Sequence, residues 1–434
     1  MKRLFAIGGW GVAFLLAWTL WQRGADQGGT FLEKRVAVLE ADNIRLSRHV
    51  TEMEDERRKA ADLPLRTKVE KDTAAIRELA FLEPVQYDVV TKDGLRAVLE
   101  QKLSAQATDE DFQNMAHAYS ALGLLPADYP LKERYVDLIR EQLGAFYDQH
   151  ERKLYMFNDA HLDNSQNRVI LAHELTHALQ DQHFKLRTFP LEILDNDDLV
   201  MATSALIEGD ATVVMTQFML GEMSGNAVKD AVRTALTQNM EQLGKAPRFL
   251  RETLIFPYLR GQDFCLALFE RGGFEAITKA YAEPPRSTAQ ILHPELYLAE
   301  PRVNPIRLSF GDPRIGDEAP IMENVLGEFS TRILLSEHGD ALLAEKAATG
   351  WRGDRYAVYR DGKAWMGVWL WASEADATEF ADAMDAALKK RHEKAGRHFF
   401  VKVLDQKRVV VADANDPDFL AKLLAKGTDA VSMP

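Results

Sequence analysis

Two histidines and a glutamate between residues 173 and 177 have the types and spacing that hold a metal ion. The string His173-Glu174-Leu175-Thr176-His177 separates the histidines by four positions. On an α-helix, residues i and i+4 lie above one another on the same face, so both imidazoles can bind one metal. Glu174 projects beside them, where a carboxylate can take a proton from a water held by the metal. This pattern predicts Zn2+ as the cofactor and is typical of zinc hydrolases.

A helix must position these side chains. Residues 167–180 are rich in apolar side chains and contain neither Gly nor Pro, which predicts a helix. An alternative is a helix with two hydrogen-bonded histidines and a surface glutamate. The chain has only 11 histidines, and three of them lie between residues 173 and 183, which favours the metal.

The third ligand has two candidates. His183 extends the spacing to three histidines, but the metzincin pattern needs a glycine where this chain has Gln180. Gln180 favours continuation of the helix, which would take His183 away from the metal. Glu208 lies in the next apolar helical stretch, residues 197–220, where a buried carboxylate needs a partner. We therefore predict His173, His177 and Glu208 as the metal ligands, a His2Glu catalytic set.

A known group of enzymes has this arrangement. A short connector after HExxH and a second helix with a glutamate resemble the gluzincin division of zincin metallopeptidases. The strings at residues 141–148, 171–184, 206–212 and 284–295 are similar to those of bacterial membrane-associated or secreted HExxH proteins. The resemblance covers roughly residues 80–430 and implies a zinc site with Glu174 as general base. It implies no particular substrate.

One position departs from the gluzincin pattern. Gluzincins commonly have an aspartate four residues after the ligand glutamate, and it orients a ligand histidine. Here that position is Thr212, so the orienting role is open between Asp181 and Asp210.

Residues 143–157 read as a β-hairpin ahead of the motif helix, with two β-prone runs around a polar turn. In zincins such a strand borders the cleft, and its backbone can pair with an extended substrate. The alternative is a hairpin that only completes a sheet, with Tyr147 and Tyr155 packed in it.

The expected reaction is peptide-bond hydrolysis by a zinc-bound water that Glu174 activates. A further donor to the oxyanion is normally worth a few kcal/mol. His293 and Tyr297 are the candidates, because Pro294 favours a loop there that can reach the cleft. An isolated histidine in a loop more often has a structural role, and that role is the alternative for His293. The competing hypothesis for the whole chain is a catalytically inactive zincin-fold binding or assembly protein of the cell envelope.

The N-terminal 25 residues predict a membrane anchor. Lys2 and Arg3 precede an uncharged apolar run at residues 4–21. The length of this run is at the lower end of the range for a membrane-spanning helix. No small-x-small cleavage site follows. We expect an uncleaved single-pass anchor in a bacterial inner membrane, with the catalytic domain facing the periplasm or outside.

A stalk or coiled coil follows at residues 26–66. Leu32, Leu39, Leu46 and Met53 share one heptad position, while Val36, Asn43 and Val50 share another. An asparagine at an a position is typical of a parallel dimer, so residues 30–60 predict either a homodimer or a single exposed helix. Pro64 is expected to end this element.

The remaining chain predicts an α+β fold in two parts. Residues 67–304 read as a helix-rich zincin-like catalytic domain with a small sheet, including helices near 225–246 and 262–281 that frame the cleft. After the Pro-rich link at 301–305, residues 305–434 read as a smaller α/β accessory domain. Its tryptophans 365, 369 and 371 are expected in the sheet core.

Composition limits the partners. The formal net charge of −13 and the lack of a basic cluster argue against nucleic acid, which leaves a peptide or protein substrate and the membrane. Cys265 is the only cysteine, so no internal disulfide forms, and we expect it in the core.

Overall fold

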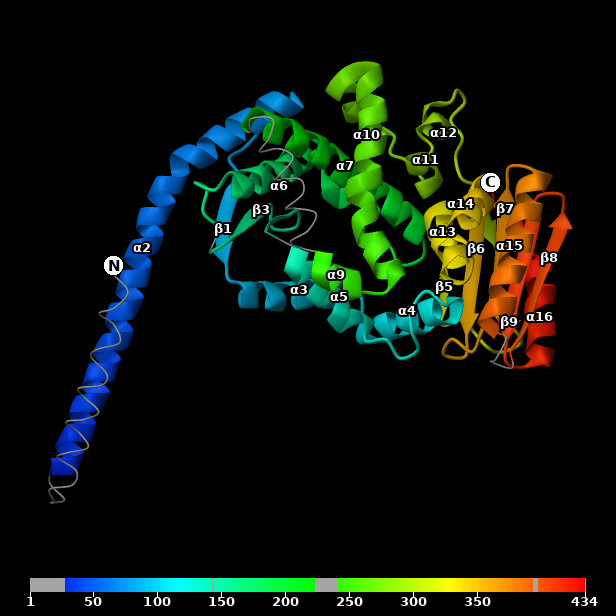
Figure 1. Ribbon diagram of the computed structural model, residues 1–434, viewed down its shortest axis with the longest axis horizontal. Coiled ribbons are helices and arrows are strands. Elements are labelled where there is room, and N and C mark those ends of the chain that lie inside the picture. The colour runs from blue at the N-terminus through cyan, green and yellow to red at the C-terminus, as the bar shows by residue number, and fades with distance from the viewer. Residues whose placement is uncertain (1–27, 143, 159, 223–239, 393–396, 434) are drawn as a thin grey trace. The chain divides into compact units, whose positions relative to one another are not determined.

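The computed structural model describes residues 28–142, 144–158, 160–222, 240–392 and 397–433 as an α+β chain (Figure 1). The helices are α2 (Gly28–Arg77), α3 (Lys92–Gln106), α4 (Asp109–Leu122), α5 (Leu131–Gln142), α6 (Ser165–Phe184), α7 (Asp197–Glu222), α9 (Met240–Lys245), α10 (Arg248–Ala282), α11 (Thr288–Leu292), α12 (Pro294–Leu298), α13 (Gly327–His338), α14 (Ala341–Ala348), α15 (Glu374–His392) and α16 (Pro417–Thr428), with a 3-10 turn at Leu186–Thr188. The strands are β1 (Gln86–Val90), β2 (Ala145–Asp148), β3 (Lys153–Phe157), β4 (Arg307–Ser309), β5 (Met322–Asn324), β6 (Trp351–Tyr359), β7 (Ala364–Trp371), β8 (His398–Asp405), β9 (Arg408–Ala414) and β10 (Val431–Met433). The predicted membrane anchor at residues 1–25 and most of the predicted helix near 225–246 lie outside the described residues.

Helix α2 continues through Pro64, so the prediction that this proline ends it is wrong. A proline inside a helix removes one backbone hydrogen bond, which neighbouring packing can outweigh. Val69, Thr73 and Arg77 follow at four-residue spacing, and all three are fully buried. The chain forms two compact units that meet at Thr67 and Lys68, and these last turns of α2 belong to the second unit.

A small sheet and the long helix α7 pack against the motif helix α6. The sheet has the order β1-β3-β2, in which β1 pairs parallel to β3 and β2 pairs antiparallel to it. Strand β2 is therefore an edge strand, and it packs against α6. On another side α6 packs against α7, which in turn packs along α10 (Figure 1).

Two glycines allow α7 and α10 to approach very closely. A methyl group on Gly209 would lie 2.2 Å from the backbone of Gly261, and one on Gly261 would lie 2.1 Å from the carbonyl oxygen of Ala205. Both distances are far below van der Waals contact, so only glycine fits at either position. Helix α7, which contains Glu208, is therefore in direct backbone contact with α10.

The C-terminal sheet has five antiparallel strands in the order β5-β6-β7-β9-β8. Side chains alternate between its faces, as the two-residue period of a strand requires. Trp365 and Trp369 pack in the main core with Phe380 of α15, while Met366 and Val368 pack with α16. The three tryptophans are buried in the sheet, as predicted.

The main hydrophobic core extends across the predicted boundary between residues 304 and 305. Its members include Leu206 of α7, Phe256 of α10 and Trp369 of β7. Among the described residues one helix is long and apolar enough to cross a membrane, Asp197–Gly221, and 61% of its apolar window is buried inside the protein. That segment is α7, and its apolar surface belongs to this core.

Candidate metal centre

The structure brings His173, His177 and Glu208 together. The Nε2 atoms of the two histidines lie 3.1 Å apart, and Glu208 Oε2 lies 3.1 Å from His173 Nε2 and 3.4 Å from His177 Nε2. The histidines come from successive turns of α6 and the glutamate from α7. Across the described residues this is the group of side chains whose ligand atoms converge for a metal, all within 4.8 Å.

These separations fit a tetrahedral zinc. With metal–ligand distances of roughly 2.0–2.1 Å, neighbouring ligand atoms lie about 3.3 Å apart. The three observed distances are within a few tenths of an ångström of that value. The Glu208 side chain keeps 22% of its surface exposed, so the cluster opens to solvent on one side. Three ligands with an open side are what a catalytic zinc site requires.

The charges also favour a cation between these groups. Burial alone would lower the pKa of His177, but the carboxylate of Glu208 raises it to about 9. Burial would raise the pKa of Glu208, and the two histidines instead hold it well below its usual range. The cluster thus attracts a proton, and a divalent cation would compete for the same place.

Glu174 is buried beside the cluster and is tied to the edge strand. Its Oε2 accepts a hydrogen bond of 2.7 Å from the backbone N–H of Tyr147 in β2. Burial is the largest influence on this carboxyl and raises its pKa, while the two nearby histidines oppose the change. Its Oε1 is the oxygen left to accept a proton. A carboxyl whose pKa is shifted toward neutrality suits a general base.

Gln180 holds the ring of His177, a role that its helix propensity does not reveal. Its Oε1 lies 2.8 Å from His177 Nδ1, and its Nε2 donates to the carbonyl of Ile207 and to Asp210 Oδ2. Because the amide nitrogen faces two acceptors, the amide oxygen must face His177. His177 therefore donates from Nδ1 and presents Nε2 to the cluster.

The two aspartates predicted for the orienting role contact neither ligand histidine. Asp210 acts one step away, through Gln180. Asp181 accepts from the hydroxyl of Tyr147 at 3.0 Å, and so supports the strand that holds Glu174. At the gluzincin aspartate position, Thr212 bonds to the backbone carbonyl of Glu208. His173 Nδ1 is buried without a hydrogen-bond partner among the described residues.

His183 lies away from the cluster. Helix α6 continues through Gln180 to Phe184 and ends at Lys185, whose backbone is left-handed. On this last turn His183 Nε2 lies 2.8 Å from the carbonyl oxygen of Ala80.

Tyr258 of α10 lies at the cluster, and sequence reasoning missed it. Its ring stacks on that of His173, with centroids 6.0 Å apart and planes at 28°. The negative charge of Glu208, then burial and Glu174, raise its pKa well above the ordinary value. Tyr258 therefore keeps its proton at neutral pH, and 39% of its surface is exposed. No motif surrounds it, so the sequence has no signal that singles it out.

His293 and Tyr297 have partners elsewhere. His293 Nε2 lies 2.6 Å from Glu328 Oε1 of α13, and that pairing raises the pKa of His293. The Tyr297 hydroxyl donates to the carbonyl of Glu283. Neither makes a described contact with His173, His177 or Glu208.

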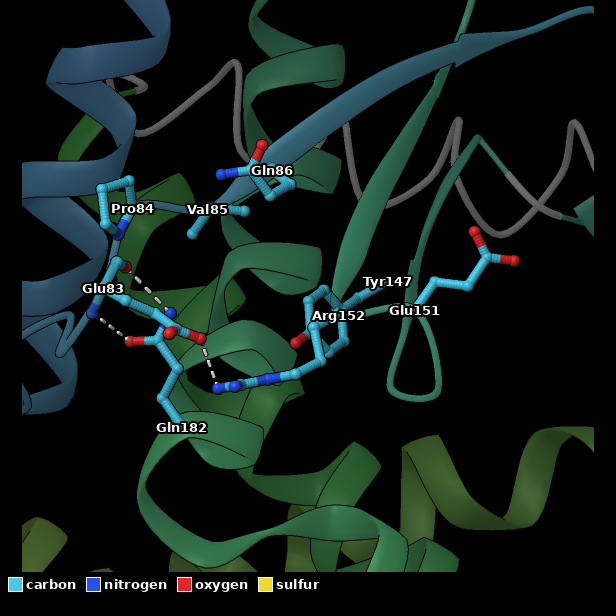
Figure 2. Close-up of a pocket in the computed structure, with 8 residues that line it drawn as sticks. All are labelled: Glu83, Pro84, Val85, Gln86, Tyr147, Glu151, Arg152 and Gln182. Carbon is cyan, nitrogen blue, oxygen red and sulfur yellow. Dashed lines mark hydrogen bonds and ion pairs between the residues drawn. The ribbon is translucent and has the colours of Figure 1, made fainter.

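A pocket of about 190 Å3 lies beside β2 (Figure 2). Its walls come from residues 83–86, from the β2–β3 hairpin and from Gln182 of α6. Glu83 forms an ion pair with Arg152 at one side, and Gln182 bonds to the backbone of Glu83. Tyr147 connects this pocket to the cluster, since its side chain lines the pocket and its N–H binds Glu174.

The C-terminal part of the chain is similar to a known domain family. Residues 317–423, from just before β5 into α16, match a domain of unknown function, DUF8575. No curated protein and no solved structure matches the chain. The match includes all five strands of the C-terminal sheet and none of the residues of the candidate metal centre.

Proposed function

We propose that this chain is a zinc metallopeptidase that hydrolyses peptide bonds, built on a zincin-like domain. The observation that supports it is the convergence of His173, His177 and Glu208 at tetrahedral spacing, with the Glu174 carboxylate buried beside them. That combination provides three metal ligands, an open side and a general base in one place. With the predicted anchor, the enzyme would act at the outer face of a bacterial inner membrane.

Each residue has a separate task. His173, His177 and Glu208 would hold Zn2+, which when bound lowers the pKa of water toward about 7 and polarises a carbonyl. Glu174 takes the proton on Oε1 while its Oε2 stays bound to the Tyr147 N–H. It then returns that proton to the departing amine. The hydrogen bond to β2 keeps the carboxylate from rotating out of line.

Strand β2 offers a surface for an extended substrate. It is the edge of its sheet, and the N–H of Tyr147 points away from β3 toward Glu174. Residues two apart on a strand point the same way, so the backbone of Ala145 also faces that side. A peptide that added as a strand here would run past the cluster and bind to the backbone of Ala145 and the carbonyl of Tyr147, because the Tyr147 N–H stays bound to Glu174.

Tyr258 is the better placed of two donors for the oxyanion. It stacks on a ligand histidine and keeps its proton, as such a donor must. His293, the donor expected from sequence, has its Nε2 engaged by Glu328. We therefore assign the donor role to Tyr258 and a structural role to His293.

The decisive experiment compares the purified full chain with Glu174→Gln. We expect one zinc per chain in both proteins, because Glu174 is not a ligand, and cleavage of a peptide library by the unsubstituted chain alone. Metal content by mass spectrometry and cleavage by product sequencing measure the two properties separately. Zinc without cleavage in both proteins would favour the binding or assembly protein, and absence of zinc would refute the metal centre itself.

A further inference from the structure

We propose that Arg77 is a positioning residue for the metal centre, acting through Asp210 and Gln180 on His177. This inference rests on the proposed zinc site. It adds a residue on α2 that orients a ligand, whereas the ligands themselves lie on α6 and α7. Arg77 is the last residue of α2, and no sequence motif marks it.

Arg77 is completely buried, and each of its three side-chain nitrogens has a hydrogen-bond partner. Its Nε lies 2.8 Å from Asp210 Oδ1 and 3.1 Å from Oδ2, with no exposed side-chain surface on either partner. The two terminal nitrogens donate to the hydroxyl of Thr278, at 3.1 and 3.2 Å. The guanidinium also lies over the ring of Phe274, 5.0 Å from its centre. Such a side chain has one available orientation.

Asp210 transmits this constraint to Gln180. Its Oδ2 accepts from Arg77, from the hydroxyl of Tyr281 at 2.9 Å and from Gln180 Nε2 at 3.1 Å. Paired with a guanidinium, the carboxylate is an acceptor only. It therefore requires the amino end of the Gln180 amide, and a rotated amide would set oxygen against oxygen.

The orientation of Gln180 decides the orientation of His177. The amide oxygen receives the Nδ1–H of the imidazole at 2.8 Å, which directs Nε2 toward Glu208 and His173. His173 has no such partner on its own Nδ1 among the described residues. The support of the ligand set therefore passes mainly through His177, Gln180 and Asp210 to Arg77.

Stability alone does not explain a charged group at this place. A buried ion pair seldom stabilises a fold more than an apolar pair of the same volume, because both charges lose their hydration. An apolar pair would fill the space but would leave the Gln180 amide nitrogen with a single acceptor, the carbonyl of Ile207. Asp210, held by Arg77, adds a second and charged acceptor for the same amide nitrogen, which strengthens the orientation that the metal site needs.

The test measures zinc affinity of the full chain by competition with a chromophoric chelator. We expect Arg77→Gln to bind zinc about tenfold more weakly, the lower range for changes in groups that orient a ligand. Because Arg77→Gln leaves the Asp210 carboxylate without its guanidinium partner, a double variant with Asp210→Asn removes both charges. The double variant still takes away the charged acceptor of the Gln180 amide, so it should weaken zinc binding similarly.

The matched control is Arg397→Gln. Arg397 also pairs with a fully buried aspartate, Asp413, at 2.7 Å, but in the C-terminal sheet. We expect this variant to lose stability and keep its zinc affinity within about twofold of the unsubstituted chain, well inside the effect expected at Arg77. Unchanged zinc affinity in folded Arg77→Gln or in the double variant, or equal loss in Arg397→Gln, overturns the inference.

A second readout needs no metal. With 15N-labelled histidine, the Nδ1–H of His177 should give an exchange-protected signal in the unsubstituted chain and in Arg397→Gln, and lose it in Arg77→Gln. If the unsubstituted chain binds no zinc, the proposed function fails, and this signal alone decides whether Arg77 positions His177. Equal protection in all three proteins would refute the positioning role.

Discussion

His183 and Glu208 compete for the third ligand position in the sequence, and a pair of substitutions separates them. Glu208→Ala removes an oxygen that lies 3.1 Å from His173 Nε2. Zinc affinity should fall by more than about 100-fold, because loss of a group that only orients a ligand already costs up to about that much. His183→Ala removes a contact with the Ala80 carbonyl and should leave zinc affinity unchanged. Calorimetric titration with zinc measures both. Tight binding in Glu208→Ala would show that another group is the third ligand.

Tyr258 and His293 give a second contrast at the residue scale. Tyr258→Phe removes only a hydroxyl, so kcat should fall by about 10²- to 10³-fold if that hydroxyl stabilises the oxyanion, with KM and zinc affinity little changed. His293→Gln should lower thermal stability, because it breaks the pairing with buried Glu328, while kcat stays close to that of the parent. Normal kcat in Tyr258→Phe together with a large loss in His293→Gln would reverse the two assignments.

Spacing within one element was enough to predict His173, Glu174 and His177, because a helix fixes which residues share a face. Glu208 followed from the cost of burying a carboxylate on an apolar helix. Gln180, Tyr258 and the N–H of Tyr147 could not be predicted in the same way. Tyr258 and Tyr147 reach the site from other elements. Gln180 contacts His177 within α6, but acceptors on α7 orient its amide, so its sequence shows only a preference for a helix.

At the scale of elements, the close contact of α7 and α10 should control the position of Glu208. Gly261→Ala would place a methyl group 2.1 Å from the Ala205 carbonyl, so the helices must separate. We expect a loss of about 1–3 kcal/mol in unfolding free energy, typical of overpacking, and weaker zinc binding. Chemical denaturation and zinc titration measure these.

Gly221→Ala, on the helix of Glu208, α7, is the control for Gly261→Ala on α10. A methyl group there meets nothing within 4 Å, so the variant should be more stable by about 0.5–1 kcal/mol, because alanine loses less backbone entropy than glycine. Equal zinc affinity in both glycine variants would show that the helix contact does not position Glu208.

Asp198, in the first turn of α7, should give the fold a pH dependence. Burial raises its pKa from 3.8 to about 7, against the hydrogen bonds from Thr288. The folded state then binds this proton more tightly than the unfolded chain, so the unfolding free energy should fall as pH rises from 3.8 to about 7. Asp198→Asn cannot titrate and should flatten that slope, measured by denaturation across this range.

Asp312→Asn is the matched control for this slope. Asp312 is exposed, and hydrogen bonds from Arg314 lower its pKa to about 2. Its contribution is therefore present above its ordinary pKa of 3.8 and is lost only as pH falls toward 2. This variant should follow the parent between pH 4 and 7, and a slope unchanged by Asp198→Asn would exclude Asp198 as its source.

Element types were more predictable than element ends. The hairpin, α7 and the strands around the tryptophans appear where the two-residue and 3.6-residue periods indicated. Helix α2 did not end at Pro64, because buried residues beyond the proline stabilise its last turns. The local sequence predicts that Pro64 destabilises the helix. The packing that outweighs this effect involves residues far along the chain, so the local sequence does not predict it.

At the scale of the whole molecule, residues 68–434 form one compact unit, although the Pro-rich link at 301–305 predicts a domain boundary there. The C-terminal segment contributes directly to the helix of Glu208. Asn324 of β5 accepts from the N–H of Asp197 at 2.8 Å and donates to its carboxylate at 2.9 Å, at the start of α7. Sequence alone could not predict this cap, because the two residues are 127 positions apart.

The a and d positions on α2 predict that the chain forms a homodimer through residues 30–60. Leu39 and Leu46, at d positions, expose 58% of their surface each in a single chain, which a parallel partner helix would cover. We expect the full chain in detergent to sediment as a dimer. Replacing both leucines with lysine should give a monomer, because two charges would face each other across the seam.

Val38 and Ile44 provide the control for this experiment. They are as exposed, at 58% and 63%, but lie at c and b positions, off the seam. Replacing both with lysine adds the same charge to the same helix and should leave the dimer intact, since a coiled coil buries only its a and d positions. Loss of the dimer in both double variants would indicate nonspecific apolar association. A full chain that is monomeric at every concentration, and that chemical cross-linkers do not join, would instead make α2 a single stalk helix.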